Sequence, residues 1–280
     1  MKIAATVEEI RSAVKAWKKE GLSVGFVPTM GYLHEGHQSL MQKAVSENDR
    51  VVVSIFVNPM QFGPSEDLES YPRDLEKDAS LCEASGVDLI FHPEPKEMYH
   101  PDFSSFVDMH GLTESLCGKS RPAHFRGVCT VVTKLFNIVQ PDRAYFGQKD
   151  AQQLAVIQQM VRDLNLDVTV IGCPIIREAD GLAKSSRNSY LSADERKAAL
   201  VLSQALEVAK QLLANGEQNA AKIRNAISET IQAEPLAKVD YVELVDARTL
   251  QQVDSVERPV LVALAVYIGK TRLIDNFITE

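Results

Sequence analysis

Short apolar runs alternate with helix-length segments through the first two thirds of the chain, and this alternation limits the possible fold more than any other feature. The apolar runs lie at residues 23–28, 50–58, 87–92, 144–147 and 168–173. Helical patterns fill gaps between them, at residues 39–48, 74–85 and 151–164. Strands that alternate with helices in this way form an open parallel sheet covered on both faces, and such sheets bind ligands beyond the carboxyl ends of their strands. We therefore expect the functional loops to be those that leave the strands.

The pattern changes after the last of these runs. Residues 192–234 are helical in pattern, with a break at Asn215-Gly216. Three strand-like runs with short connections follow, at residues 239–245, 259–268 and 272–277. Short connections favour a small antiparallel sheet. We predict an α/β fold, with a Rossmann-like, doubly wound parallel sheet in residues 1–175 and a smaller α+β domain in residues 176–280.

Charge and cysteine usage exclude several classes of protein. The formal net charge of −8 argues against a nucleic-acid partner, because such proteins usually carry a basic face that neutralises phosphates. Cys82, Cys117, Cys129 and Cys173 are far apart and form no CxxC pair, which favours reduced, buried thiols in a cytosolic protein. No apolar stretch is long enough to span a bilayer, and the N-terminus does not resemble a signal peptide. We expect a soluble, cytoplasmic protein with small-molecule ligands and no membrane partner.

Residues 28–37 (PTMGYLHEGH) follow an apolar strand and enter a helix. His34 and His37 are three residues apart, so they lie on one helical face near the helix N-terminus, where free amides and the helix dipole favour phosphate. Gly36 lets a flat ligand approach the backbone, since it has no Cβ. There are two alternatives: the histidines are surface residues at an ordinary helix start, or they are a pair of metal ligands. The position after a strand favours phosphate, and no further His or Cys cluster supports a metal, although distant carboxylates could assist one.

Polar residues with phosphate chemistry follow later strands as well. Gly147 allows close approach, Lys149 offers a mobile positive charge, and Asp150 suits a helix cap or a contact associated with magnesium. In residues 184–187 (KSSR), two hydroxyls and a guanidinium can hold a triphosphate and offset charge on departing pyrophosphate. The simpler alternatives are a capped helix with a solvated lysine and a flexible polar loop between domains.

The amide of Gln61 follows the second internal strand, in the segment NPMQF. An amide has donors and an acceptor, so it can bind a hydroxyl and a carboxylate together. It can equally be a loop amide that faces water, and these residues alone do not decide between the two.

Five segments occur in one order along the chain: PTMGYLHEGH, SIFVNPMQF, HFRGVCTVVTKLFNIVQPD, YFGQKD and KSSRNSYL. Together they resemble the pantothenate synthetases, a family of the HIGH-motif nucleotidyltransferase superfamily. HEGH resembles the HIGH motif, and KSSR resembles the KMSKS-type loop. Two positions depart from the family pattern, since Lys184 stands where many relatives carry an apolar residue and Ala123 replaces an expected glycine. Lys184 can therefore contact phosphate or point to solvent.

The resemblance implies the condensation of (R)-pantoate with β-alanine through a pantoyl adenylate, with ATP cleaved to AMP and pyrophosphate. It implies ATP as a substrate, Mg²⁺ with unknown ligands, a homodimer, and a lid role for residues 176–280. ATP contacts are implied for Met30, Gly31, Tyr32, Leu33, His34, Glu35, Gly36, His37, Gly147, Gln148, Lys149, Asp150, Ile176, Lys184, Ser185, Ser186 and Arg187. Contacts with pantoate or β-alanine are implied for Asn58, Gln61 and Gln153. The residues expected to carry catalysis are His34, His37, Lys149, Ser185, Ser186 and Arg187, and the resemblance favours His37 for any proton transfer.

Two other functions stay open at this point. A different adenylyl-transferring enzyme of the same superfamily would release a nucleotide product instead of an amide. A regulatory module would bind ATP without consuming it, although the complete set of HEGH, GQKD and SSR argues against that function.

Overall fold

The computed structural model describes residues 1–64, 66–257 and 259–279, and the chain divides into two compact units. The first unit comprises Met1–Met109, Arg121–Gln148 and Gln153–Pro174. The second unit comprises His110–Ser120, Lys149–Gln152 and Ile175–Glu280. Two short segments from the earlier part of the chain thus belong to the second unit. The division into a binding domain (residues 1–175) and a lid domain (residues 176–280) stays a prediction.

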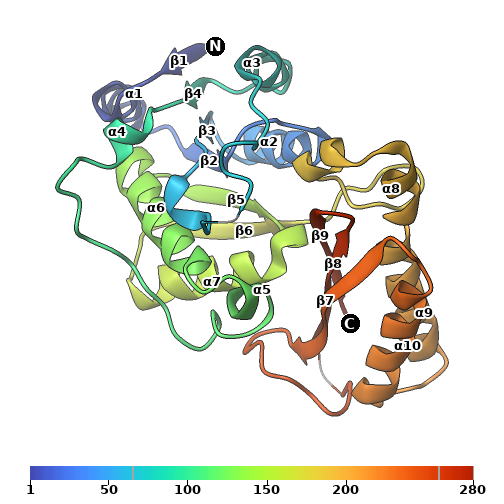
Figure 1. The fold of residues 1–280 in the computed structure, drawn as a ribbon. Helices are drawn as coiled ribbons and strands as arrows, with labels where there is room; N and C mark the ends of the chain where they lie inside the picture. The colour runs from blue at the N-terminus through green and yellow to red at the C-terminus, as the bar shows by residue number, and fades with distance from the viewer. Residues whose placement is uncertain (65, 258, 280) are drawn as a thin grey trace. The chain divides into compact units, whose positions relative to one another are not determined.

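A six-stranded sheet forms the centre of the first unit, in the order β1-β4-β3-β2-β5-β6 (Figure 1). Every paired strand is parallel to its neighbour. The strands are β1 (Lys2–Ala4), β2 (Val24–Thr29), β3 (Arg50–Ile55), β4 (Leu89–Phe91), β5 (Arg143–Gly147) and β6 (Thr169–Cys173). The predicted fold class is confirmed, and β1 is a short edge strand that the sequence pattern did not predict.

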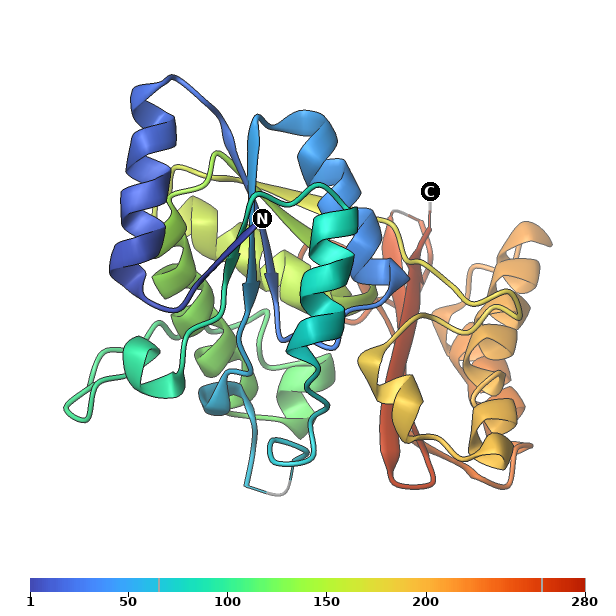
Figure 2. The same ribbon diagram turned by 90° about the horizontal axis from the view of Figure 1, so that it is seen from above.

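Helices cover both faces of this sheet, which explains why the central strand β3 is buried from Val51 to Ile55 (Figure 2). On one face, Leu40, Met41 and Cys82 from α2 and α3 pack against Val53 and neighbouring strand residues. On the other face lie α1 and α6. The helices are α1 (Val7–Lys19), α2 (Glu35–Glu47), η1 (Pro59–Gln61), α3 (Leu75–Ala84), α4 (Pro95–Met98), α6 (His124–Val139) and α7 (Ala151–Asp163), whose first two residues belong to the second unit.

The direction of strand order reverses between β2 and β5, which are direct neighbours in the sheet. From β2 the chain moves outward to β3 and β4, and from β5 it moves the other way to β6. Crevices beyond the carboxyl ends of strands at such a reversal are where open α/β sheets bind ligands. The loop after Thr29 and the end of β5 at Gly147 both lie at this edge.

The second unit is built on the predicted antiparallel sheet, in the order β7-β8-β9. Its strands are β7 (Ala237–Asp246), β8 (Val260–Ile268) and β9 (Thr271–Ile278). Leu202, Leu206, Ile223 and Ile227 from two long helices pack with Leu264 of β8 in a buried core. The helices are α5 (Leu116–Ser120), η2 (Gln148–Asp150, which begins in the first unit), η3 (Ser186–Tyr190), α8 (Ala193–Ala198), α9 (Val201–Ala214) and α10 (Ala220–Gln232). Within the three described ranges, no helix has both the length and the apolar character needed to cross a membrane.

Candidate active site

The first group of candidate residues lies where β2 ends and α2 begins. His34 is the N-cap residue of α2, and its Nδ1 accepts the backbone N–H of Gly36 at 3.1 Å. The Nδ1 of His37 accepts the backbone N–H of His34 at 3.3 Å, so the two imidazoles cap the helix reciprocally. Their ring centroids are 4.1 Å apart. The helix begins at Glu35, beside the histidines as predicted and four residues before the helical pattern at residue 39, because these side chains satisfy its first amides.

The use of Nδ1 as the acceptor decides what these rings can offer a ligand. A neutral imidazole that accepts through Nδ1 carries its proton on Nε2. Each ring then presents an N–H donor at a helix N-terminus, where the helix dipole also favours an anion. Among the described residues, no group of three or more His, Cys, Asp or Glu side chains could hold a metal ion. The arrangement suits a phosphate oxygen better than a metal pair bound through Nδ1.

Asp78, on α3, holds the turn that leads into this helix. Its side chain is 1% exposed, and its oxygens accept the backbone N–H groups of Tyr32 at 2.8 Å and Leu33 at 2.6 Å. Gly31 has a φ of 85°, and a Cβ there would lie 2.9 Å from Ile55 and 3.0 Å from Asp78. Burial raises the pKa of Asp78, and the amides of Leu33 and Tyr32 partly oppose that rise. No local sequence pattern marks Asp78, because it lies 46 residues after Tyr32.

Two of the three residues predicted to bind pantoate or β-alanine, Asn58 and Gln61, lie beside the same segment. Asn58 is the N-cap residue of η1 and is 1% exposed, and its Nδ2 donates to Gln61 Oε1 at 3.0 Å. The Nε2 of Gln61 lies 3.0 Å from the sulfur of Met30. The first unit therefore brings Asn58 and Gln61 together with the loop that precedes His34. Gln153, the third predicted residue, is half-buried on α7.

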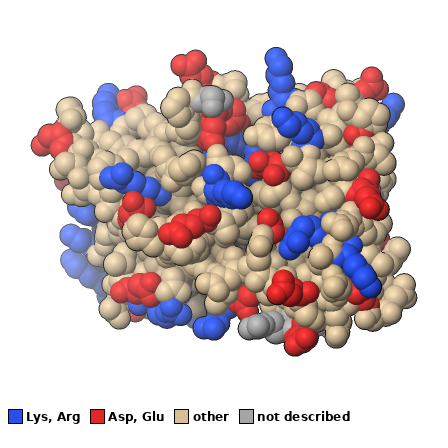
Figure 3. Space-filling view, turned by 60° about the horizontal axis from the view of Figure 1, so that its bottom comes forward, with Lys and Arg blue, Asp and Glu red and all other residues tan. Residues whose placement is uncertain are grey.

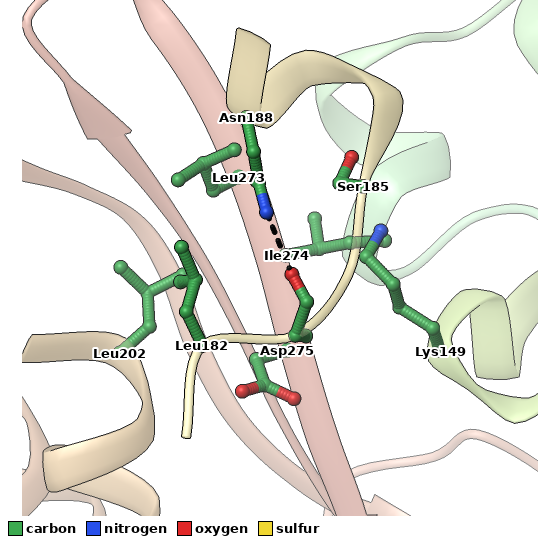
Figure 4. Close-up of a pocket in the computed structure, with 9 residues that line it drawn as sticks. Lys149, Leu182, Ser185, Asn188, Leu202, Leu273, Ile274 and Asp275 are labelled. Atoms are coloured by element: carbon green, nitrogen blue, oxygen red, sulfur yellow. Dashed lines mark hydrogen bonds between the residues drawn. The ribbon is translucent and has the colours of Figure 1, made fainter. Parts of the chain in front are cut away.

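The second group of candidate residues lies around a small cavity in the second unit (Figure 4). The cavity is lined by Lys149, Leu182, Ala183, Ser185, Asn188, Leu202, Leu273, Ile274 and Asp275. Lys149 and Ser185 lie on one side of it, and Leu182 and Leu202 lie on the other (Figure 4). Ser185 is the N-cap residue of η3, and its Oγ accepts the backbone N–H of Arg187 at 3.3 Å. The second unit thus brings Lys149 to the predicted KSSR loop.

Two adjacent residues of strand β9 hold Lys149 and the KSSR loop in place. Asp275 is 1% exposed, and Arg177 donates to its two oxygens at 2.6 and 2.9 Å. The same guanidinium donates to the carbonyl of Gly181 at 3.0 Å, which closes the loop that leads to Ser185. The neighbouring Asn276 donates from Nδ2 to the carbonyl of Lys149 at 2.8 Å. Consecutive residues of one strand therefore fix the Lys149 backbone and the base of the KSSR loop, and sequence reasoning identified neither.

Other predicted residues of the second unit are less closely tied to the cavity. Lys184 forms an ion pair with Glu178 at 2.8 Å, so its charge already has a partner. The carbonyl of Ile176 accepts the backbone N–H of Lys184 at 2.9 Å. Asp150 is exposed in η2. The role of each in binding ATP stays a prediction.

Lys and Arg side chains are interspersed with Asp and Glu over the face that Figure 3 displays. Mixed charge of this kind fits the net charge of −8. Because the described residues form no extended basic patch on this face, individual cationic side chains must provide the positive potential at a bound phosphate. Lys149 and Arg187 are the candidates for this role in the second unit. The predicted ATP-binding residues fall into two groups, one in each unit.

Comparison with known proteins covers the chain from end to end. A family model described as pantoate-beta-alanine ligase matches residues 2–278. A pantothenate synthetase from Enterococcus faecalis is 64% identical over 280 residues, covering 100% of this chain and 99% of the relative. One from Clostridium acetobutylicum is 61% identical over 277 residues, covering 99% of each.

Solved structures give the same result. The pantothenate synthetase from Thermus thermophilus superposes with a TM-score of 0.94 at 46% identity, covering 99% of both chains. A pantoate-beta-alanine ligase from Francisella tularensis, complexed with beta-gamma ATP and beta-alanine, gives a TM-score of 0.81 at 37% identity, covering 99% of this chain and 97% of the other. With its parallel sheet, its capped His34–His37 helix start and these full-length matches, the chain belongs to the pantoate–β-alanine ligase family, the family of the pantothenate synthetases.

Proposed function

We propose that this ligase joins (R)-pantoate to β-alanine through a pantoyl adenylate and releases AMP and pyrophosphate. The observation that carries the proposal is the start of α2, where His34 and His37 use Nδ1 to cap the helix and keep a proton on Nε2 for a phosphate oxygen. The Francisella relative, solved with an ATP compound and β-alanine, supports both as substrates of this chain. Pantothenate formation supplies a precursor for coenzyme A.

Adenylation is the step that the candidate residues suit best. The pantoate carboxylate attacks the α-phosphorus of ATP, a P–O bond forms, and the bond to the β-phosphate oxygen breaks to release pyrophosphate. Negative charge grows on the departing group, and we assign Lys149 and Arg187 to offset it, with the hydroxyls of Ser185 and Ser186 as donors. His34 and His37 hold the phosphate under attack. No protein nucleophile is needed, so positioning and electrostatics carry this step.

Amide formation follows on the same activated acid. The amine of β-alanine attacks the pantoyl carbonyl, and AMP leaves with the electrons of the acyl C–O bond. Asn58, Gln61 and Gln153 are the proposed contacts for pantoate and β-alanine. A mixed anhydride hydrolyses in open water, so we assign residues 176–280 a lid role that keeps water away.

Magnesium, a homodimer and a cytoplasmic location are further parts of the proposal. Mg²⁺ usually keeps phosphate and water ligands and needs only one or two protein carboxylates, so it would enter with ATP. Asp150 is a carboxylate suited to such a contact, and no reaction step is assigned to the ion. The four cysteines are free and buried, which suits a reducing compartment. The homodimer rests on family resemblance, and light scattering on the purified protein would test it.

An AMP-release assay tests the proposed function directly. Purified protein with ATP, Mg²⁺, pantoate and β-alanine should release AMP and pyrophosphate in equal amounts with the amide. Nicotinate mononucleotide or phosphopantetheine in place of pantoate should give no product. Absence of AMP with the complete mixture would contradict the proposal, and ATP binding without turnover would favour a regulatory module.

A further inference from the structure

The amide of Asn58 has only one orientation that its backbone neighbours allow. Its Oδ1 accepts the backbone N–H of Met60 at 3.3 Å, and its Nδ2 donates to the carbonyl of Gly127 at 3.2 Å. A backbone N–H can only donate and a backbone carbonyl can only accept. Exchanging the oxygen and nitrogen of Asn58 would set donor against donor and acceptor against acceptor at a site that is 1% exposed.

This orientation determines what the two neighbouring side chains do. The hydroxyl of Tyr99 lies 2.8 Å from Oδ1 of Asn58, so it must donate its proton there. The amide of Gln61 faces Nδ2 of Asn58 at 3.0 Å, so it must present Oε1 to that donor. Its Nε2 group then points the other way, where the sulfur of Met30 lies at 3.0 Å. The backbone-fixed amide of Asn58 thus sets the direction of both hydrogen bonds, the one from Tyr99 and the one to Gln61.

The remaining freedom of Gln61 is removed by its backbone contacts. Its carbonyl oxygen accepts from Nδ1 of His124 at 2.9 Å and from Nη2 of Arg121 at 3.3 Å. Arg121 is itself paired with Glu66 at 2.6 Å. With the backbone of Gln61 held by His124 and Arg121, the orientation of its side-chain amide depends on the bond from Asn58.

Tyr99 is a suitable residue to hold this orientation. Its ring packs between Phe56 and Phe103, with centroid distances of 6.3 and 5.0 Å, so the hydroxyl has a fixed place. Burial raises the pKa of Tyr99, so the hydroxyl keeps its proton and stays a donor. The Tyr99 hydroxyl supplies the shorter of the two bonds that Oδ1 of Asn58 accepts from Tyr99 and Met60.

We propose that Tyr99 is a positioning residue for the acid substrate: its hydroxyl holds Asn58 in the place where Nδ2 of Asn58 makes Gln61 an N–H donor toward a carboxylate or hydroxyl oxygen of that acid. This inference rests on the proposed function and narrows it. Gln61 recognises its substrate with the donor end of its amide, so the site favours acids that place an oxygen acceptor there. Tyr99 itself does not touch the reacting atoms.

Tyr99→Phe tests the inference, because it removes only the hydroxyl. Loss of one hydrogen bond that holds Asn58 in place should raise the KM for pantoate about tenfold. The KM for ATP should stay within about twofold, since Met30 is the one predicted ATP residue that these bonds reach, and they reach it only through its side-chain sulfur. Tyr145→Phe is the matched control: that buried hydroxyl donates to Glu47 and accepts from Asn48, at 2.8 Å in each case. It should lower the melting temperature without changing the KM for pantoate.

A second variant tests the relay at Asn58 itself. Asn58→Asp keeps an acceptor toward Tyr99 but sets an oxygen against the Gly127 carbonyl and against Gln61, so Gln61 turns Nε2 inward and presents Oε1 to the substrate. We expect a larger rise in the KM for pantoate than Tyr99→Phe causes. Adding Tyr99→Phe to Asn58→Asp should raise it no further, because neighbours in one network do not act additively.

The outcomes separate this inference from the proposed function. An inactive wild-type protein would defeat the proposed function. An active wild type with folded Tyr99→Phe and an unchanged KM for pantoate would overturn the inference alone. Equal rises in the KM for ATP and for pantoate would overturn it as well, because they indicate a general loss of structure.

Discussion

The two candidate phosphate-binding segments are held in place by different physical means. In the first unit, the His34–His37 segment is fixed through its backbone, since buried Asp78 accepts two amides of the preceding turn. In the second unit, the Lys149 segment is fixed from a distant strand, where Asn276 binds its carbonyl and the adjacent Asp275 anchors the KSSR loop. One segment offers neutral N–H donors at a helix end, and the other offers full positive charges.

This difference suggests that the two segments have different roles in binding and catalysis. Neutral donors at a fixed helix start can orient a phosphate without attracting other anions strongly. Cations such as Lys149 are the groups that can offset the charge of departing pyrophosphate. Positioning is therefore expected to depend on geometry in the first unit, and charge compensation on electrostatics in the second. Substitutions that separate geometry from charge test this comparison.

The largest effect is expected from removing the charge of Lys149. Lys149→Ala should lower kcat by about 10²–10³-fold, as loss of one electrostatic stabiliser of a transition state does. The protein should stay folded, because Asn276 binds the backbone carbonyl of Lys149 and not its side chain. Stopped assays of AMP release at saturating substrate measure this. Lys197→Ala, at an exposed lysine of the same unit, is the control and should leave kcat unchanged; a similar loss there would contradict a specific role.

Asp275→Asn should have the next largest effect, on stability. The substitution leaves the guanidinium of Arg177 facing a neutral amide, and breaking a buried ion pair from one side costs about 2–3 kcal/mol when one partner is partly exposed. Urea unfolding measures the loss. Asp180→Asn breaks the more exposed pair with Arg196 and should cost less than about 1 kcal/mol. Equal losses in the two variants would show that burial of Asp275 is not what matters.

Gly31→Ala should have a moderate effect, confined to the first segment. Gly31 has a φ of 85°, and an added Cβ would lie 2.9 Å from Ile55. Strain of this kind costs about 1–2 kcal/mol, and it should displace the turn before His34. Thermal unfolding measures the first effect, and the KM for ATP should rise. Gly216 also has a positive φ, but an added Cβ would have no neighbour within 4 Å, so Gly216→Ala should affect stability without changing the KM for ATP. A change in the KM for ATP in that variant would show that the effect of Gly31→Ala is not specific to the site.

Asp78→Asn tests the first segment through the pH dependence of stability, and the change with pH is expected to be the smallest of these effects. Burial raises the pKa of Asp78, so the native state binds a proton more tightly than the unfolded chain does. Its contribution to stability is therefore complete below the unfolded pKa of about 3.9 and is lost as the pH rises toward the raised value. The stability of the wild type relative to Asp78→Asn should thus fall as the pH rises above about 4 in urea titrations. A difference that grows with pH would mean that the charge of Asp78 stabilises the turn.

The features that the sequence predicted are those with a local cause. The apolar strands, the helix that starts beside His34, and the antiparallel C-terminal sheet all follow from patterns within ten to fifteen residues. The adjacency of Gln61 to the segment containing Met30 follows from neighbouring parallel strands β2 and β3, whose carboxyl ends share one edge. Loops at that edge could therefore be predicted to carry the site.

The features that escaped prediction depend on contacts between distant residues. Strand β1 has three residues and too short a pattern to recognise. Asp78, Tyr99 and Asp275 act through backbone or side-chain groups far away in the sequence, and each occupies a position that a simple helix, loop or strand would also explain. Segment His110–Ser120 belongs to the second unit because Gln152 binds its backbone, which no periodicity reveals.

Pantoate-dependent exchange between ATP and labelled pyrophosphate, measured without β-alanine, tests the central claim most directly. Reversible formation of a pantoyl adenylate predicts that label enters ATP only when pantoate is present, and that Lys149→Ala slows the exchange by about two orders of magnitude or more. Exchange that needs β-alanine, or amide formation without any pantoate-dependent exchange, would contradict the adenylate route and the charge-compensating role of the second unit.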